Sequence, residues 1–275
     1  MTDTGTDNGT NKQTNNAIRR AVENDKPVFG TSAATFSPTM IEVFGELGLD
    51  FVWLDLEHGG PSPYDSTALE ELTRAADVVD IELLVRIPMP EPSIVRKVVD
   101  AGVRTVLIPR VETAEELRPA IEAAYFSYDG DVGDRGVGIG RGSRWAGYAD
   151  SHVGDADEDV LVGTMIENER ALDNLESILS VPQLGFAFLG PADMEMSMSG
   201  GDPLTKSPDA VADGIDTTLE ACLDAGVPAG RILNDPDAAA DAVDDGFQIV
   251  RIGDDIGAVR QVLSDRLATV TAGEE

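Results

Sequence analysis

Short, mostly apolar segments recur along the chain, and each is bounded by Gly, Pro or Asp. Segments that are apolar throughout, rather than alternating, are typical of parallel strands buried on both faces. Eight segments have this character: residues 27–30, 50–54, 82–87, 105–109, 160–166, 185–189, 231–233 and 247–252. The pattern therefore predicts eight strands.

The segments between these strands have helical periodicity. Ser37 and Pro38 form an N-cap and a first-turn proline ahead of an apolar stripe that stops at Gly48. Thr113 and Glu116 form a capping box. Three further apolar stripes occupy residues 171–179, 211–222 and 256–267.

Eight strands that alternate with helices predict a (β/α)₈ TIM barrel of the α/β class. The alternative is a doubly wound open sheet, but eight strands in about 250 residues favour the barrel. Residues 1–16 are Thr, Asn, Gly and Asp without apolar periodicity, and they predict a disordered polar tail. We therefore expect one barrel domain over residues 17–275.

Composition narrows the classes of partner. The 275 residues include 20 Lys and Arg against 51 Asp and Glu, a formal net charge of −31. Such a surface repels phosphate backbones and anionic lipid, so neither nucleic acid nor a membrane is an expected partner. An acidic, lysine-poor chain is also similar to proteins of salt-loving organisms, because concentrated salt screens the self-repulsion.

The sequence also lacks a disulfide pair, a targeting or membrane segment, and a lysine at the end of a strand. Cys222 is the single cysteine, so no internal disulfide can form, which fits a reducing cytoplasm. No signal-peptide pattern and no apolar run of about 20 residues are present. None of the four lysines ends a predicted strand, which argues against Schiff-base chemistry; they are Lys12, Lys26, Lys97 and Lys206.

The stretch from residue 127 to residue 159 interrupts the strand–helix rhythm. It contains Arg135, Arg141, Arg144 and Trp145, which are unusual in so acidic a chain. Loops of this length are commonly functional or disordered. An anion-binding or subunit-contact loop and a solvated loop both fit the stretch.

Chemistry in a barrel lies where the strands end. The polar residues at these positions follow in chain order. They are Asp55, Glu57 and His58 after the second strand, Arg86 at the end of the third, Glu167 after the fifth, Asp193 after the sixth, and Arg251 and Asp254 near the end of the eighth. Two carboxylates without a cysteine favour a hard divalent cation such as Mg²⁺ or Mn²⁺ at Glu167 and Asp193. Salt bridges, for example with Arg86, explain these two acids equally well.

Seven short motifs follow one another in barrel order. They are Trp53-Leu-Asp55-Leu-Glu57-His58, Val85-Arg86-Ile-Pro88, Val99-Asp100-Ala-Gly102, Arg135-Gly-Val-Gly138, Ser143-Arg-Trp145, Met165-Ile-Glu167 and Gly190-Pro-Ala-Asp193. Together they resemble the HpcH/HpaI class II aldolases, which cleave or form 4-hydroxy-2-oxo acids using pyruvate. The resemblance covers residues 17 to 270, and it is specific for the family rather than for a substrate.

The resemblance implies how the substrate is held. Glu167 and Asp193 are expected to bind Mg²⁺, Mn²⁺ or Co²⁺, which pyruvate chelates through its keto and carboxylate oxygens. Backbone amides at Ala192 and Asp193 are expected to hold the pyruvate carboxylate. Met165 stands where many relatives have a Gln that can contact pyruvate.

The resemblance also implies catalytic roles. Arg86 is expected to stabilise the enolate oxygen, His58 to act as acid and base, and Asp100 to orient His58. Asp55 and Glu57 are expected to support the site through waters or further hydrogen bonds. The implied reaction splits a 4-hydroxy-2-oxo acid, such as a 2-dehydro-3-deoxy sugar acid, into pyruvate and an aldehyde.

Family members are similar to oligomers with shared sites, so we expect a homo-oligomer, a trimer or a hexamer. In it, Arg141 or Arg144 is expected to face a neighbour's active site. A related lyase acting on CoA thioesters or phosphoenolpyruvate is an alternative, although the chain has no obvious lysine cluster for CoA phosphates. A non-catalytic barrel is a second alternative, against which the intact set of site residues argues.

Overall fold

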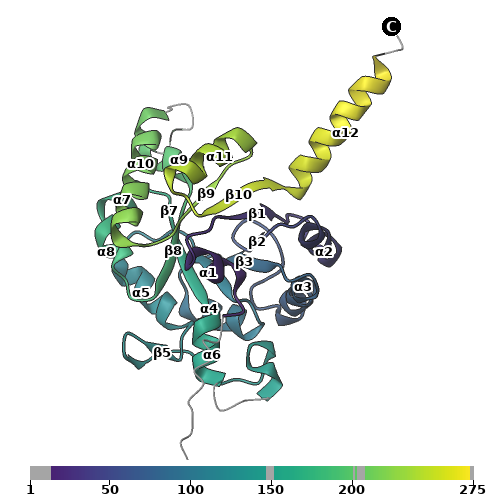
Figure 1. The fold of residues 1–275 in the computed structure, drawn as a ribbon. Coiled ribbons are helices and arrows are strands. Elements are labelled where there is room, and N and C mark those ends of the chain that lie inside the picture. The colour runs from purple at the N-terminus through teal and green to yellow at the C-terminus, as the bar shows by residue number, and fades with distance from the viewer. Residues whose placement is uncertain (1–13, 147–151, 201, 203–207, 273–275) are drawn as a thin grey trace, which may run out of the picture.

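The computed structural model describes residues 14–146, 152–200, 202 and 208–272. Eight parallel strands close into a barrel in the order β1-β10-β9-β8-β7-β4-β3-β2 (Figure 1). They are β1 Val28–Ser32, β2 Phe51–Asp55, β3 Glu82–Arg86, β4 Thr105–Ile108, β7 Leu161–Ile166, β8 Leu184–Leu189, β9 Ala229–Ile232 and β10 Ile249–Asp254. The expected (β/α)₈ barrel is confirmed, and the eight expected segments each overlap one strand.

The described residues form twelve α-helices, most of which surround the barrel (Figure 1). They are α1 Ala17–Val22, α2 Pro38–Glu46, α3 Ser66–Val78, α4 Pro92–Asp100, α5 Ala114–Glu122, α6 His152–Asp159, α7 Glu169–Asp173, α8 Leu175–Leu179, α9 Pro191–Met198, α10 Pro208–Ala225, α11 Pro236–Asp245 and α12 Asp255–Thr271. The expected caps are present: Ser37 accepts a hydrogen bond from the Met40 amide and Thr113 from the Glu116 amide. These side chains satisfy amides that a helix leaves unpaired in its first turn.

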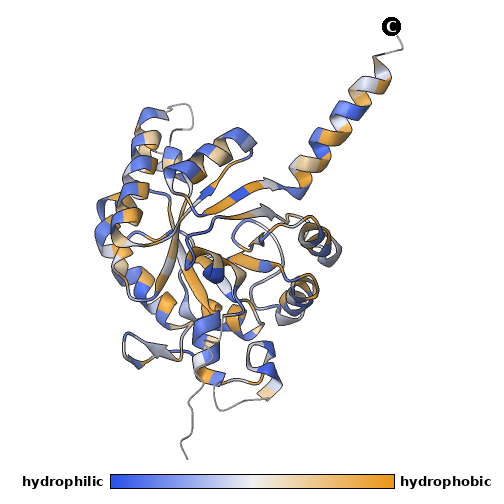
Figure 2. Cartoon of the chain, in the orientation of Figure 1, coloured by the Kyte–Doolittle hydropathy of each residue, from blue (hydrophilic) through white to orange (hydrophobic). Residues whose placement is uncertain are grey.

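The core has two layers, which Figure 2 shows as apolar residues on the strands and on the inner sides of the helices. The outer layer lies between strands and helices. The inner layer fills the barrel, where Trp53 and Phe188 meet edge to face with ring centroids 4.9 Å apart. A Cβ added to Gly30 would lie 2.4 Å from the ring of Phe51, so glycine makes room for this packing. The barrel is therefore filled, and ligands can enter only at its ends.

The N-terminal segment closes one end of the barrel. Residues 1–13 of the expected tail lie outside the described residues, but residues 14–16 differ from a tail. Asn16 is buried, caps α1 and donates to the Thr105 hydroxyl at 2.8 Å. The Asn15 amide donates to Asp159 at 2.7 Å. With the buried Ile18 of α1, this segment seals the end where the strands begin.

The stretch between α5 and β7 has structure of its own. It contains the hairpin β5 Ser127–Tyr128 and β6 Asp131–Val132, the 3₁₀ helix η1 Arg141–Ala146, and α6. Its glycines pass close to the end of α4, where a Cβ on Gly142 would lie 2.5 Å from the Val99 carbonyl oxygen. The stretch therefore lies at the N-terminal end of the barrel in its own chain.

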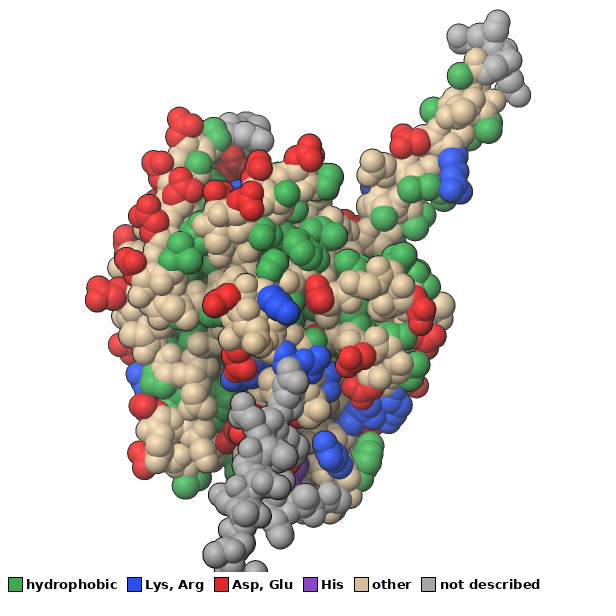
Figure 3. Space-filling view, viewed as in Figure 1, with side chains coloured by type: hydrophobic (Ala, Val, Ile, Leu, Met, Phe, Trp, Pro, Cys, Tyr) green, Lys and Arg blue, Asp and Glu red, His purple; other side chains and the backbone are tan. Residues whose placement is uncertain are grey.

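The last helix, α12, projects away from the barrel (Figures 1 and 3). The expected helix over residues 256–267 is confirmed, but its apolar stripe is exposed, by 45% at Ile256, 55% at Leu263 and 63% at Leu267. Ile252, on the outer face of β10, is 38% exposed. In a (β/α)₈ barrel the last helix covers this outer surface.

Among the described residues, no helix combines the length and apolar character needed to cross a bilayer.

Candidate active site

The mouth of the barrel, the end where the strands finish, brings most of the predicted residues together. Asp55 ends β2 and Arg86 ends β3, and the two are paired in the strand register. Glu167 directly follows β7. Asp193 lies in the first turn of α9, after β8, and is exposed. Parallel strands place all of these positions at one end of the sheet.

Arg86 is fixed by two carboxylates. Its Nε lies 3.0 Å from Asp55 Oδ1 and its Nη2 lies 2.6 Å from Asp55 Oδ2. Its Nη1 lies 3.1 Å from Glu57 Oε2, and the guanidinium lies 5.5 Å from the centroid of the Trp53 ring. Burial opposes the charge, but Asp55 and Glu57 raise the pKa of Arg86 overall. Burial also raises the pKa of Asp55, yet Arg86 brings it below its usual value. Arg86 is thus a positioned cation.

Glu57 connects three basic groups. Its side chain is only 6% exposed, and it contacts Arg86, Arg110 and His58. Arg110 Nε lies 2.5 Å from Glu57 Oε1. His58 Nε2 lies 3.7 Å from Glu57 Oε2, and 55% of the His58 side chain is exposed at the rim. Within one chain, the carboxylate beside His58 is therefore that of Glu57 rather than the expected Asp100.

Glu167 is buried and accepts a hydrogen bond of 2.6 Å from the Arg110 amide. Burial raises the pKa of Glu167, the charges of Asp193 and Glu57 raise it further, and Arg86 counteracts them. Within the described part of the chain, neither Glu167 nor Asp193 has an ion-pair partner within 4 Å. The salt-bridge alternative is therefore not what the structure contains, and negative charge accumulates here.

Gly190 leaves room beside Glu167. A Cβ at Gly190 would lie 2.8 Å from Glu167 Cβ and 2.8 Å from Met165 Cε, so a larger residue here would displace Glu167. After Gly190, α9 begins with Pro191, and its first-turn amides, including those of Ala192 and Asp193, lack intrahelical partners. Met165 is buried inside the barrel beneath this point and contributes a thioether rather than an amide.

The oxygen atoms of Glu167 and Asp193 suit a hard divalent cation. No group of three or more His, Cys, Asp or Glu in the described ranges has an arrangement that could hold a metal. Mg²⁺, however, is commonly bound by one or two carboxylates and completes its octahedron with water and substrate oxygens. Two carboxylates with unbalanced charge at an open mouth fit that mode of binding.

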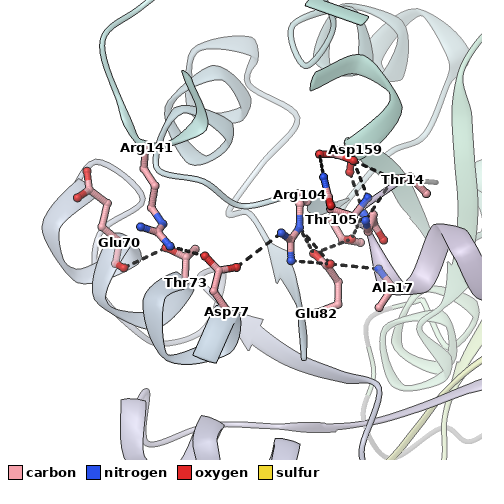
Figure 4. A network of polar contacts seen from close by, with 12 residues as sticks. Thr14, Ala17, Glu70, Thr73, Asp77, Glu82, Arg104, Thr105, Arg141 and Asp159 are labelled. Atoms are coloured by element: carbon pink, nitrogen blue, oxygen red, sulfur yellow. Dashed lines mark hydrogen bonds and ion pairs between the residues drawn. The ribbon is translucent and has the colours of Figure 1, made fainter. Parts of the chain in front are cut away.

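Two groups of predicted residues lie at the N-terminal end of the barrel, opposite the mouth. Asp100 is the last residue of α4, which runs from the mouth back to the N-terminal end, and Gly140 packs against it. Arg141 pairs with Asp77, which also lies 3.6 Å from Arg104 (Figure 4). Arg144 lies beside Arg141 in η1. One chain therefore does not bring Asp100, Arg141 or Arg144 to His58.

Arg110 is a site residue that the sequence did not reveal. It has a positive φ of 58°, its amide holds Glu167, and its side chain holds Glu57. Its position immediately after the predicted strand 105–109 is the signal that could have identified it.

Comparisons with known proteins identify the family of the chain. The HpcH/HpaI aldolase/citrate lyase family matches residues 30–261. A hydroxypyruvate/pyruvate aldolase from Roseobacter denitrificans is 30% identical over 243 residues, covering 88% of this chain and 91% of that protein. A 2-keto-3-deoxy-L-rhamnonate aldolase from Klebsiella pneumoniae is 29% identical, covering 92% of each. The crystal structure of an HpcH/HpaI aldolase/citrate lyase family protein from Burkholderia cenocepacia has a TM-score of 0.83 at 27% identity, covering 93% of this chain and 99% of that one. This chain belongs to the HpcH/HpaI aldolase/citrate lyase family.

Proposed function

We propose that this chain is a divalent-metal-dependent aldolase that cleaves or forms a 4-hydroxy-2-oxo acid, with pyruvate and an aldehyde as the other reactants. One observation carries the proposal: no cation of the described residues lies within 4 Å of the carboxylates of Glu167 and Asp193, and both lie at a mouth that also holds the fixed cation Arg86. The aldolase names of the two relatives support the same reaction type.

Glu167 and Asp193 would hold the metal, Mg²⁺, Mn²⁺ or Co²⁺. When bound, the ion polarises the 2-oxo group of the substrate as a Lewis acid. The unpaired amides at Ala192 and Asp193 hold the substrate carboxylate, and Met165 forms the apolar floor beneath it.

Arg86 supplies a preplaced charge for the oxygen on C2, where negative charge develops as the carbon–carbon bond breaks. Because Asp55 and Glu57 already fix the guanidinium, no reorganisation is needed during the reaction. His58, at the rim, accepts the proton of the C4 hydroxyl as the C3–C4 bond breaks. The aldehyde leaves, and a proton added to C3 completes pyruvate. Glu57 lies beside His58, with Glu57 Oε2 3.7 Å from His58 Nε2.

The active enzyme is a homo-oligomer, a trimer or a hexamer, with one barrel domain over residues 17–275 in each subunit. In it, the partner subunit's Asp100 orients His58, and the partner's Arg141 or Arg144 faces the mouth. Two observations support assembly: one chain separates these residues from His58, and α12 exposes an apolar stripe while its own barrel leaves Ile252 uncovered. A second copy of α12 is the occupant that fits this uncovered surface.

The single cysteine, buried as a free thiol, supports a place in the cytoplasm. The net charge of −31 supports a cytoplasm with a high salt concentration, because salt screens the repulsion between the acidic side chains.

Exchange of the pyruvate methyl protons with deuterium, followed by NMR with Mn²⁺ in concentrated KCl, tests the proposal. We expect exchange in the wild type, loss of exchange with EDTA, and a loss of at least ~100-fold in Glu167→Gln and Asp193→Asn. Glu46→Gln, an exposed acid at the far end of α2, is the matched control. A wild type that never exchanges these protons would contradict the aldolase assignment and favour a non-catalytic barrel.

A further inference from the structure

Phe36 lies at the mouth of the barrel, in the segment that joins β1 to α2. Its backbone has a positive φ of 48°, a conformation that bulky residues rarely adopt. The side chain is half-buried and packs against the outer layer of the core, to which Leu56 belongs. Backbone strain of this kind persists only where the surrounding structure holds it, and it is concentrated at functional sites.

The segment before Phe36 is anchored to α12. The buried carboxylate of Asp255 accepts hydrogen bonds from the Ala34 amide at 2.9 Å and from the Thr35 amide at 3.0 Å. The Thr35 hydroxyl donates to the same carboxylate at 2.5 Å. The Phe36 amide donates to the Ala33 carbonyl oxygen at 3.4 Å, which closes a tight turn. The backbone that carries the Phe36 ring is therefore held in place.

The ring of Phe36 lies against the two glycines that follow His58. A Cβ added to Gly60 would lie 2.5 Å from two carbons of the ring, and a Cβ added to Gly59 would lie 3.7 Å from a third. Gly60 has a φ of 75°, which glycine adopts without strain, and its lack of a side chain lets the ring approach. Phe36 thus packs on a pair of residues that are intrinsically free to bend.

Few contacts hold His58 within one chain. Its imidazole makes no hydrogen bond with the described residues, and the Glu57 carboxylate, 3.7 Å away, is its one ion-pair contact among them. The His58 amide donates to Asp55 Oδ1 at 3.4 Å, which is a long hydrogen bond. The position of the imidazole therefore depends on the backbone of residues 57–60, against which Phe36 packs.

We propose that Phe36 is a positioning residue, which fixes the backbone after β2 so that the His58 imidazole stays where it accepts the substrate proton. This inference rests on the proposed function, which assigns that proton transfer to His58. Displacement of a reacting group by ~1 Å can lower a rate by ~100-fold. Because Phe36 acts through His58, its loss should lower kcat far more than it changes the KM for pyruvate.

Phe36→Ala removes the ring, and steady-state kinetics of the aldol reaction measure the result. We expect kcat to fall by ~10- to 100-fold, with the KM for pyruvate changed by less than ~3-fold. Phe36→Leu keeps an apolar side chain against the glycines and should lose less. In a His58→Ala background, Phe36→Ala should have no further effect on the residual rate, because the effects of two residues that act as a unit are not additive.

NMR follows the His58 imidazole itself. The chain has two histidines, His58 and His152, so protein labelled with isotopic histidine gives one imidazole signal for each. The His58 signal is the one that disappears in His58→Ala. With Mg²⁺ and pyruvate present, we expect this signal to shift or broaden in Phe36→Ala, while the signal of His152, which lies in α6, stays unchanged.

Matched variants separate positioning from general destabilisation. Phe29→Ala removes another half-buried ring, near the start of β1 and away from the mouth, and should leave kcat and the His58 signal unchanged. Gly60→Ala gives the answer if Phe36→Ala does not fold, because its Cβ would push the loop away from the ring, and kcat should fall. Gly48→Ala is the control for Gly60→Ala, because its φ of 84° is equally positive but a Cβ there would meet no atom within 4 Å.

The outcomes separate this inference from the proposed function. A loss of kcat in Phe36→Ala that only equals the loss in Phe29→Ala, or that persists in the His58→Ala background, would overturn the inference. An unchanged His58 signal in Phe36→Ala would do the same. In each of these cases a wild type that exchanges pyruvate protons leaves the aldolase assignment intact. Absence of that exchange in the wild type refutes the proposed function and, with it, the role of Phe36.

Discussion

At the scale of single residues, Glu57 holds the mouth together. Its nearly buried carboxylate contacts Arg86, Arg110 and His58, so one charge lies beside both the fixed cation and the histidine that we propose as the proton carrier. Residues that act through others in this way affect the chemical step more than substrate binding.

Glu57→Gln retains the shape of the side chain and removes its charge. We expect kcat to fall by ~10- to 100-fold with a smaller change in the KM for pyruvate, because Arg86 and His58 lose their shared anion. Steady-state kinetics of the aldol reaction measure this effect. Glu46→Gln serves as the control, and an unaltered kcat in Glu57→Gln would show that Asp55 alone positions Arg86.

Asp255 makes stability depend on pH. Burial acts to raise its pKa, but hydrogen bonds from Thr35 and the Ala34 amide hold the pKa of Asp255 below its ordinary value of 3.8. A depressed folded pKa stabilises the protein above pH 3.8, and this contribution disappears as the pH falls through the folded value.

Asp255→Asn should therefore cost ~1–3 kcal/mol of unfolding free energy at pH 7. The difference from the wild type should shrink as the pH falls below 3.8. Urea denaturation across this pH range measures both values. A difference that stays constant with pH would mean that the side-chain charge contributes nothing.

At the scale of elements, α12 shows which features of a helix the sequence pattern encodes and which it does not. Periodicity correctly predicts the helix, its apolar stripe and its approximate ends. It does not encode whether the stripe packs on its own barrel, because that depends on the direction in which α12 leaves β10.

Leu263→Glu should weaken self-association of the chain, since it places a charge in the exposed apolar stripe of α12. Gln261→Glu adds the same charge two residues away, on the opposite side of the helix, and should have little effect. Sedimentation velocity over a range of protein concentrations measures the difference. Equal behaviour of the two variants would argue that α12 does not form the interface.

In the candidate active site, too, the sequence pattern encodes some features and not others. Position at the end of a buried strand was sufficient to predict Glu167, Asp193 and Arg86 at one mouth, because parallel strands finish together. The contacts of Glu57 with Arg86 and Arg110 could not be predicted, since they depend on how the side chains after β2 and β4 bend over the mouth. Only the resemblance identified Asp100, since helix position alone does not place it near His58.

At the scale of the whole molecule, 51 acids against 20 basic residues impose self-repulsion that salt reduces. We expect the midpoint of thermal unfolding to rise by ~10 °C or more between dilute buffer and molar KCl, since a change of 1 kcal/mol moves a chain of this size by ~2–4 °C. Sucrose at equal osmolality is the control, because it does not screen charge. Full stability in dilute buffer would refute adaptation to salt.

In the proposed oligomer, the exposed α12 would also determine where assembly stops. If two copies exchange this helix reciprocally, each apolar stripe covers the exposed outer surface of the other barrel. No apolar surface is then left for a third copy, and the particle is closed. If each copy instead passes its helix to the next, the copies close into a ring such as a trimer where the rotation between them allows it. Otherwise one free helix and one vacant surface remain at the ends, and every added copy renews them. The choice between a discrete particle and a fibre then depends on the angle at which α12 leaves β10. Asp255, the first residue of α12, is bonded to Thr35 and Ala34, so the start of this helix is tied to the segment after β1.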